Sequence, residues 1–391
     1  MKIAVIGVKG IPAKQGEIER YCQQLYPRIA ARGHQVDLFV RPEYHRQPWF
    51  SVYYYNNIRA IALASVSGKK INSLLNCAFD TIWATFGNYD VIHIHGIAAA
   101  WFCWFPQLVS PSPVIVTCHQ LDTRQSKRHP WFNWLLQQSE KLVVKHANKV
   151  VVTSAALRRY FHQKYHVRPV YIANAPASYS APNTNYYSLR QALGLKNKPY
   201  LLYLGKFEPE QRLELLLEAF SRLQPHHCQL VLAGEISNAP KYAANLISIA
   251  DRYDNVICIS KIRGSHLAEL VRGAKMVIDP SAGADLDLSM NLLEAMREGI
   301  PVLASDTEIH CQLLQSNRGL LFKSGKSDSL LTQLKYGMSQ PSLLQAMAKK
   351  AQQYIAIYHN WDRITYKNLY LYLQLADKMP IEPEKQRAFD N

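Results

Sequence analysis

Short apolar runs alternate with segments of helical periodicity along the first half of the chain. In residues 18–32 apolar side chains recur every three or four positions, which predicts a helix with one buried face. The runs that predict strands are 2–6, 35–40, 91–95, 114–117 and 149–153. Strands that alternate with helices in this way predict an α/β fold with a parallel sheet covered by helices on both faces.

A second cycle of the same kind begins near Pro199. Its predicted strands are 200–204, 229–233, 255–259 and 276–279, and its predicted helices are 213–223, 241–253 and 265–273. Residues 177–198, in which Ser, Pro and Asn cluster, are the expected linker region. We therefore expect two Rossmann-like domains, 1–180 and 181–354, facing across a ligand-binding cleft, because open parallel sheets bind ligands at the carboxyl ends of their strands.

The end of the chain is expected to differ from both domains. The apolar pattern of residues 355–375 predicts a helix that packs back on the N-terminal domain. Residues 376–391 lack a periodic apolar pattern and are expected to form a disordered tail.

The most informative segment predicts a helix that opens toward a ligand. Ser289 and Asn291 are both favourable N-cap residues, and Gly299 with Pro301 ends the helix before a buried strand. The free amides at a helix start form an anion site that suits a diphosphate. Glu294, expected in the first turn, is placed to accept hydrogen bonds from a ribose or a sugar. The segment therefore indicates a nucleotide-sugar site.

Composition narrows the class of protein. The chain has 391 residues, of which 48% are hydrophobic and 19% charged, as in a globular protein with more than one core. Its seven cysteines form no C-x-x-C pair, which indicates reduced thiols in a cytoplasmic protein. The apolar segment 96–109 is shorter than the ~20 residues of a membrane span, and we interpret it as a helix buried against the sheet, with membrane insertion as the alternative.

Positive charge is concentrated in the first half of the chain. Residues 1–180 carry 21 Lys and Arg against 8 Asp and Glu, net +13, whereas the remainder carries 24 against 21, net +3. Such a one-sided field suits docking on the inner face of an anionic cell membrane or on an anionic acceptor. Nucleic acid is the competing partner, but no nucleic-acid motif accompanies the charge. The candidate membrane or acceptor contacts are Lys69, Lys70, Arg124, Lys127 and Arg128.

Several motifs in order resemble the retaining glycosyltransferases of family four, which have the GT-B fold. The resemblance extends from Met1 to about Leu373. The segments that carry it are 7–12, 16–20, 90–96, 116–122, 202–210 and 289–306. It implies transfer of a sugar from a nucleotide-diphosphate sugar to a glycan or lipid-linked acceptor, in cell-surface polysaccharide biosynthesis. It also implies retention of configuration, with no metal and no cofactor beyond the donor itself.

The resemblance also assigns roles to particular residues. His119 matches the family histidine that contacts the donor sugar, Lys206 the cation at the leaving diphosphate, and Glu294 the carboxylate that grips the ribose. The other expected donor contacts are Gly16, Gly205, Arg212, Asp287, Met290, Asn291, Leu292 and Leu293. Stabilising the charge that develops on a leaving diphosphate requires cations and amides of this kind.

Three departures from the family pattern fall on the donor site. Leu286 stands where the family has its first carboxylate, although Asp285 and Asp287 flank it. Gln211 replaces a lysine, and Arg212, which replaces the glycine after it, supplies the charge only if the loop is remodelled. Glu17 replaces the second glycine of a pair that approaches phosphate, and a carboxylate there repels phosphate. A catalytically degenerate partner of an active glycosyltransferase is therefore the alternative function.

Other patterns have simpler explanations. His93 and His95 alternate on one strand like a metal pair, but no carboxylate or thiol lies nearby in the sequence, which favours a structural role. Glu19 and Arg20 are expected to form a pair on a helix surface. A dinucleotide-dependent oxidoreductase is disfavoured, because Gly7 and Gly10 give G-x-x-G and Arg41 stands where an acidic ribose ligand belongs.

Overall fold

Each of the two predicted strand–helix cycles forms a sheet of its own, and the chain divides into two units around these sheets. The computed structural model describes residues 1–13, 16–45, 50–63, 71–121, 130–176, 194–195, 198–223, 228–236, 239–260, 262, 265–282 and 289–377. The first unit contains the described residues up to Asn174 and from Trp361 onward, and the second contains those in between.

The sheet of the first unit has eight strands in the order β3-β4-β2-β1-β5-β6-β7-β8. The strands are β1 (Lys2–Ile6), β2 (Gln35–Val40), β3 (Ser51–Tyr55), β4 (Ile58–Ala62), β5 (Val91–His95), β6 (Val114–Cys118), β7 (Lys149–Val152) and β8 (Val170–Tyr171). All neighbours pair in parallel except β3 and β4, which form an antiparallel hairpin at the edge. Asn56 and Asn57 turn this hairpin with positive φ angles of 44° and 65°, as a two-residue hairpin loop requires.

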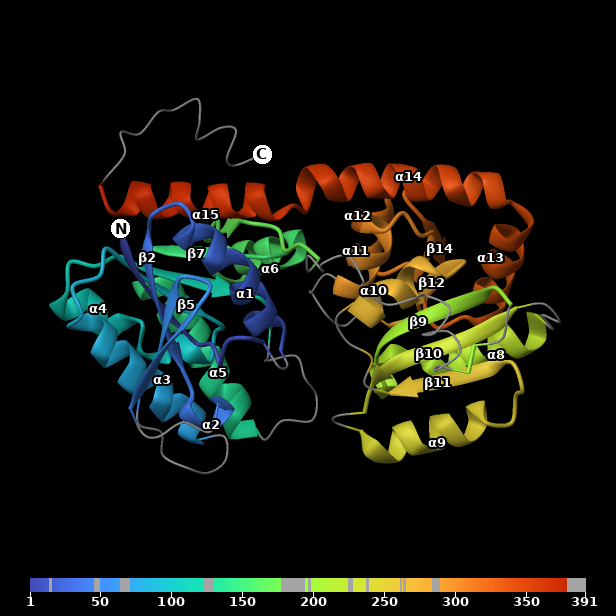
Figure 1. Ribbon diagram of the computed structural model, residues 1–391, viewed down its shortest axis with the longest axis horizontal. Coiled ribbons are helices and arrows are strands. Elements are labelled where there is room, and N and C mark those ends of the chain that lie inside the picture. Colours follow the sequence, from blue (N-terminus) through green and yellow to red (C-terminus); the bar gives the residue numbers. More distant parts are fainter. Residues whose placement is uncertain are drawn as a thin grey trace. The chain divides into compact units, whose positions relative to one another are not determined.

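Helices cover both faces of this sheet (Figure 1). They are α1 (Glu17–Ala30), α2 (Pro42–His45), α3 (Ile71–Thr85), the 3-10 helix η1 (Ala99–Phe102), α4 (Trp104–Val109), α5 (Pro130–His146), α6 (Ala155–Tyr165) and α15 (Trp361–Leu375). One face packs on α1 and α15, which contact each other, and the other face builds a core with residues of α3, η1 and α5. Because side chains alternate along a strand, Ile92 and Ile94 join that core while His93 and His95 face α1 and α15.

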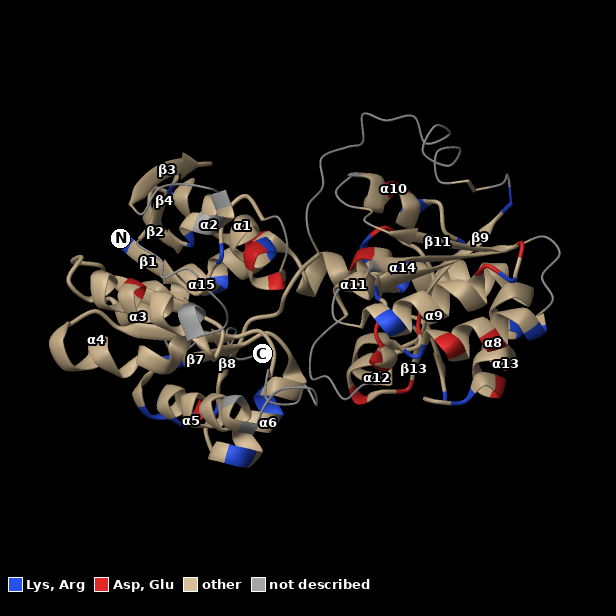
Figure 2. Ribbon diagram, turned by 90° about the horizontal axis from the view of Figure 1, so that it is seen from below, with Lys and Arg blue, Asp and Glu red and all other residues tan. Residues whose placement is uncertain are grey.

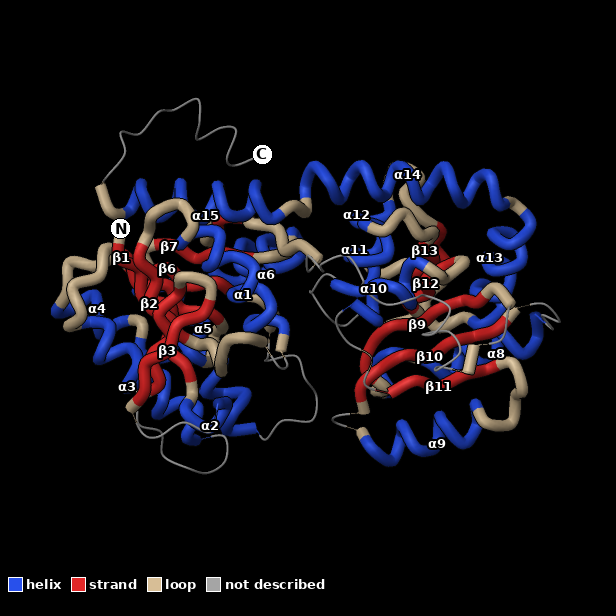
Figure 3. The backbone as a smooth tube through the Cα atoms, viewed as in Figure 1, coloured by secondary structure: helices blue, strands red, loops and turns tan. Residues whose placement is uncertain are grey.

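The second unit has a six-stranded parallel sheet in the order β11-β10-β9-β12-β13-β14, drawn in red in Figure 3. The strands are β9 (Tyr200–Lys206), β10 (Gln229–Glu235), β11 (Val256–Ser260), β12 (Met276–Asp279), β13 (Val302–Ser305) and β14 (Leu320–Phe322). The helical segments are η3 (Pro209–Gln211), α8 (Leu213–Leu223), α9 (Pro240–Ala250), α10 (Ser265–Arg272), α11 (Met290–Arg297), α12 (Glu308–Leu314), α13 (Ser327–Ser339) and α14 (Pro341–Tyr358). Two apolar clusters, one on each side of the sheet, form its core.

Two largely parallel sheets, each covered by helices, confirm the predicted α/β fold class. The expected single helix over 355–375 is wrong, since α14 ends at Tyr358 and α15 begins at Trp361. Backbone angles at His359 (φ −117°, ψ 50°) break the helix, and the Asn360 side chain donates to the carbonyl of Ala356 at 3.0 Å. The expected linker lies almost wholly outside the described residues, as does the expected tail from residue 378 onward.

Candidate donor site and histidine cluster

A buried cluster of three imidazoles lies at the carboxyl ends of β5 and β6. His93 and His95 come from β5, and His119 directly follows β6. His95 Nδ1 lies 2.9 Å from His119 Nε2, and His95 Nε2 lies 2.6 Å from the Tyr26 hydroxyl of α1. His93 Nδ1 lies 2.5 Å from the Tyr372 hydroxyl of α15 and 3.0 Å from that of Tyr26, and its Nε2 lies 2.7 Å from Thr117 Oγ1. The cluster therefore ties both covering helices to the strand ends.

All four ring nitrogens of His93 and His95 are engaged with Tyr, Thr or His partners. Neither ring is therefore free to hold a metal ion without losing a hydrogen bond, in keeping with the structural role favoured by the sequence. The described part of the chain contains no group of three or more His, Cys, Asp or Glu residues placed to hold a metal.

Burial keeps the three imidazoles neutral. It lowers the pKa of His93 and of His119 to about 3 and that of His95 well below its usual value, with the neighbouring rings of the cluster adding to the shift at His93 and His95. Each ring therefore has one N–H donor and one acceptor nitrogen, and the hydrogen bonds must be ordered accordingly.

The chemistry of the groups indicates which atom donates and which accepts in each hydrogen bond of the cluster. A phenol is a good donor and a neutral imidazole nitrogen a good acceptor, so we expect Tyr26 to donate to His95 Nε2 and Tyr372 to His93 Nδ1. His95 Nδ1 then carries a hydrogen and donates to His119 Nε2. His119 consequently carries its own hydrogen on Nδ1, and this buried nitrogen has no hydrogen-bond partner among the described residues. An N–H in this position could donate a hydrogen bond to an oxygen atom of a sugar or a phosphate.

Acidification from pH 7 to pH 5 is expected to destabilise the chain by roughly 3 kcal/mol. The unfolded histidines titrate near pH 6.5, whereas in the folded state the pKa of His93 and of His119 is about 3 and that of His95 is well below its usual value. The unfolded state therefore binds more protons in this window, and stability decreases as the pH is lowered. Asp80 acts in the opposite sense, because burial raises its pKa to about 8. Urea midpoints at the two pH values measure the difference, and His119→Gln is expected to reduce it by more than half, because each histidine contributes about 2 kcal/mol and Asp80 offsets part of the sum.

The first loop of this unit presents a carboxylate where a phosphate contact was predicted. Gly16 has φ +96°, and a Cβ there would lie 1.8 Å from Glu19 Oε2. Glu19 is buried and accepts a hydrogen bond from the Lys9 amide at 3.1 Å, so the expected surface pair with Arg20 is wrong. Glu17 accepts from the Asn174 side chain at 3.1 Å. This geometry gives Gly16 no support as a diphosphate contact, because two carboxylates lie beside it.

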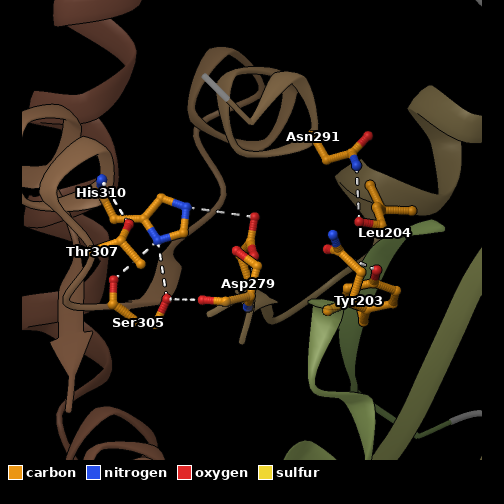
Figure 4. A network of polar contacts seen from close by, with 9 residues as sticks. Tyr203, Leu204, Asp279, Asn291, Ser305, Thr307 and His310 are labelled. Atoms are coloured by element: carbon orange, nitrogen blue, oxygen red, sulfur yellow. Dashed lines mark hydrogen bonds and ion pairs between the residues drawn. The ribbon is translucent and has the colours of Figure 1, made fainter. Parts of the chain in front are cut away.

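In the second unit the start of α11 lies beside the end of β9. Asn291 does not cap the helix but donates from its side chain to the Leu204 carbonyl at 2.8 Å (Figure 4). Ser289 is the N-cap residue by its backbone and makes no side-chain capping bond. The Leu293 amide donates to the Ser289 carbonyl at 3.1 Å, so it belongs to the helix ladder and is not the free donor expected. The amides of Met290, Asn291 and Leu292 precede that first helical bond and remain the anion-binding candidates.

Glu294 is the fifth residue of α11, one position beyond the predicted first turn. It is buried, and its neighbours Leu292 and Leu293 belong to the apolar core beneath the helix. Core packing therefore fixes the rotation of the helix and with it the placement of Glu294.

Lys206 is the last residue of β9, and its side chain is exposed. The hydroxyl of buried Tyr203 donates to the Lys206 carbonyl at 2.8 Å and holds the end of the strand. Gly234 lies opposite Gly205 in the register with β10, and a Cβ there would lie 2.0 Å from the Gly205 carbonyl oxygen. Gly234 is thus a residue of this site that the sequence reasoning missed, although a glycine at the end of an apolar strand run is a readable signal.

The two residues that depart from the family pattern after β9 have their own partners. Gln211 accepts a hydrogen bond from the Tyr203 hydroxyl at 3.3 Å. Arg212 has left-handed backbone angles (φ 52°, ψ 41°), and its exposed guanidinium lies 3.9 Å from the Glu214 carboxylate. In this structure the positive charge of Arg212 is therefore partly offset by the carboxylate of Glu214.

A polar network that the sequence reasoning also missed follows β12 and β13 (Figure 4). Ser305 donates to the Ser281 carbonyl at 2.5 Å and lies 3.2 Å from His310 Nδ1. Asp279 accepts from the Ser281 amide at 3.1 Å and lies 3.7 Å from His310 Nε2. The network ties the described residues that directly follow β12 to the end of β13 and the start of α12. Ser281 and Ser305, which join its two halves, are 24 positions apart, so no local motif marks the network.

Two family models match the two halves of the chain in order. "Glycosyl transferase 4-like domain" matches residues 16–176, and "Glycosyl transferases group 1" matches residues 187–354. The chain belongs to the GT-B glycosyltransferases of family 4 type. The family and the GT-B fold that the motifs indicated are thereby confirmed.

The individual relatives of this glycosyltransferase have low sequence identity to it, but the matches cover most of both chains. It is 24% identical over 286 residues to a phosphatidyl-myo-inositol mannosyltransferase of Mycobacterium leprae, covering 70% of this chain and 71% of that one. Its fold matches a sucrose-phosphate synthase from Thermosynechococcus elongatus with a TM-score of 0.78, at 23% identity over 97% of this chain and 100% of the other. It also matches Anabaena HepE in complex with UDP and glucose with a TM-score of 0.75, at 18% identity over 96% and 100%.

Part of the predicted site lies outside the described residues of this glycosyltransferase. Asp285, Leu286 and Asp287 do, and so do all five candidate membrane or acceptor contacts, Lys69, Lys70, Arg124, Lys127 and Arg128. Within the described part, Lys206, Gly205 and the start of α11 come together in the second unit, and His119 lies in the histidine cluster of the first.

Proposed function

We propose that the chain transfers a sugar, with retention of configuration and without a metal ion, from a nucleotide-diphosphate sugar to a glycan or lipid-linked acceptor in cell-surface polysaccharide biosynthesis. The observation that carries the proposal is the hydrogen bond from Asn291 to the Leu204 carbonyl, which places the free amides of α11 beside the strand end that bears Lys206. Amides and a cation together suit a leaving diphosphate, whose charge grows as the glycosidic bond breaks. HepE, which shares the fold, was crystallised with UDP and with UDP-glucose.

The remaining roles follow the same chemistry. Glu294 is the proposed acceptor of hydrogen bonds from the ribose hydroxyls, since it lies just beyond the free amides on α11. His119, with its hydrogen expected on Nδ1, is the proposed donor to an oxygen of the sugar. These roles need neither a metal ion nor a further cofactor.

Nucleotide binding is the direct test. Calorimetric titration with UDP, GDP and ADP, and then with their sugar conjugates, should give saturable binding of at least one diphosphate and slow hydrolysis of the matching donor. Absence of binding to every nucleotide would overturn the proposed transfer.

A non-catalytic role beside an active glycosyltransferase is the second candidate. It is favoured by the carboxylates of Glu17 and Glu19 around Gly16 and by the pairing of Arg212 with Glu214. Saturable donor binding without any hydrolysis or transfer over many hours would support this candidate against the first.

A lipid-linked acceptor would be reached at a membrane surface. We propose that the positively charged N-terminal half docks on an anionic membrane face, where lipid-linked acceptors are held. Among the described residues no helix is both long and apolar enough to cross a bilayer.

A further inference from the structure

Helix α3 exposes apolar side chains and buries polar ones, the reverse of an ordinary surface helix. Its exposed large side chains are Leu75, Phe79, Ile82 and Trp83, and Phe86 follows directly after the helix. Its inward polar side chains are Asn76, Asp80, Thr81 and Thr85. Thr81 and Thr85 each donate to the carbonyl four residues earlier at 2.6 Å, so these two hydroxyls need no water.

The exposed apolar surface continues onto the neighbouring helices. Phe86 contacts Phe105 of α4, with ring centroids 6.3 Å apart, and α4 contacts both α3 and α5. We define the aromatic face as Leu75, Phe79, Ile82, Trp83, Phe86, Leu108, Val109, Trp131 and Trp134, all of which are exposed. Half or more of the side chain is exposed at Phe79 (50%), Trp83 (52%) and Phe86 (68%). An exposed apolar surface of this extent marks an interaction site.

This structure also corrects the expectation for residues 96–109. The segment breaks at Cys103 into η1 and α4 instead of forming one buried helix. Ala100 and Cys103 enter the core, whereas Leu108 is 70% exposed. The outer half of the segment thus contributes to the aromatic face.

The charges around the aromatic face favour an anionic partner. In the described parts of α3, α4 and α5 the carboxylates are Asp80 and Glu140, and both are buried. Lys141 and Lys145 are exposed on α5, at the end opposite Trp131 and Trp134. Figure 2 shows α3 and α4 almost wholly tan, with Lys and Arg blue on α5 and α6.

We infer that the aromatic face seats in the interfacial zone of an anionic membrane, with Lys141 and Lys145 toward the lipid phosphates. Trp and Phe are the side chains that favour this zone, and an apolar helix face with flanking cations lies in its plane. A second copy of the chain fits less well, because face-to-face contact would bring together two halves of net charge +13. The inference deepens the membrane part of the proposed function and rests on it.

Vesicle binding by the full chain tests the inference without any donor. Co-sedimentation is measured with vesicles of phosphatidylcholine alone and of phosphatidylcholine mixed with phosphatidylglycerol. Wild type is expected to partition onto the mixed vesicles, and the triple variant Phe79→Ser, Trp83→Ser, Phe86→Ser to bind roughly tenfold less or weaker still. Because these side chains are exposed, the variant should fold as the wild type does.

A matched variant in the second unit controls for general loss of apolar surface. Ile236→Ser, Tyr253→Ser, Tyr336→Ser also removes three exposed apolar side chains, and it should bind vesicles like the wild type. Lys141→Glu, Lys145→Glu should weaken binding to mixed vesicles and abolish the preference for phosphatidylglycerol.

Three outcomes would overturn the inference. They are absence of wild-type partitioning, retention of binding by the aromatic-face variant, and a wild-type dimer in sedimentation velocity that this variant abolishes. Nucleotide titration of the same proteins keeps the two proposals apart. Loss of vesicle binding with intact nucleotide affinity concerns only the membrane face, whereas absence of nucleotide binding in the wild type concerns only the transfer.

Discussion

Lys206→Ala is expected to lower kcat by about 100-fold or more, with a smaller change in KM for the nucleotide sugar. The charge on the diphosphate grows as the glycosidic bond breaks, so a cation at the end of β9 stabilises the transition state more than the bound donor. The substitution should leave stability almost unchanged, because the side chain is exposed and the strand end is held by the Tyr203 hydroxyl through the backbone. Initial rates at saturating donor, with the donor identified by titration, measure the effect.

A matched lysine controls for the loss of positive charge alone. Lys335 is exposed on α13 in the same unit, and Lys335→Ala should keep kcat within about twofold of wild type. Lys206→Arg retains the charge but changes its geometry, so an intermediate rate is expected. A Lys206→Ala enzyme as fast as the Lys335→Ala enzyme would show that another group neutralises the leaving diphosphate.

Much of the fold is predictable because local pattern and tertiary structure agree along most of the chain. The predicted strands 2–6, 35–40 and 91–95 coincide with β1, β2 and β5. Each is a buried strand of a parallel sheet, where an unbroken apolar run is a strong local signal. The hairpin of β3 and β4 was not predicted, although Asn56 and Asn57 between two aromatic or apolar runs is a recognisable turn signal.

The site is predictable only as far as its residues lie close in sequence. The start of α11 and the end of β9 each carry a local motif, but their junction through Asn291 and Leu204 depends on the strand order of the sheet. The partners of the histidines could not be predicted either, because Tyr372 lies 279 positions from His93. Contacts of that kind depend on tertiary structure and leave no periodic trace.

Helix α3 shows a second reason why the structure cannot be derived fully from the sequence. An apolar residue on a helix is normally assigned to the core, and period alone does not distinguish which face is buried. In α3 the apolar side chains at helical spacing point outward, so the sequence pattern alone cannot show which face of the helix packs on the sheet. Only the position of the sheet reveals that Phe79 and Trp83 are exposed.

Gly7→Ala is expected to be the most destabilising of these substitutions, with a loss of roughly 3–5 kcal/mol. Gly7 follows β1 with φ +94°, a conformation that costs an alanine energy wherever it occurs. The added Cβ would also lie 2.2 Å from the His95 carbonyl oxygen, which belongs to the backbone of the paired strand β5. This clash can be relieved only if β1 and β5 move apart, which would also displace the histidines that β5 carries. Urea unfolding followed by circular dichroism measures the loss.

Gly33→Ala separates the two causes of that loss. Gly33 has φ +83°, close to that of Gly7, but a Cβ there would meet no atom within 4 Å. It should therefore cost only the backbone strain, about 1–2 kcal/mol, and the difference between the two variants measures the clash with His95. Equal losses for Gly7→Ala and Gly33→Ala would mean that β1 and β5 absorb the extra methyl group. If Gly7→Ala is too unstable to purify while Gly33→Ala folds, the clash is at least as costly as expected, because backbone strain is common to both.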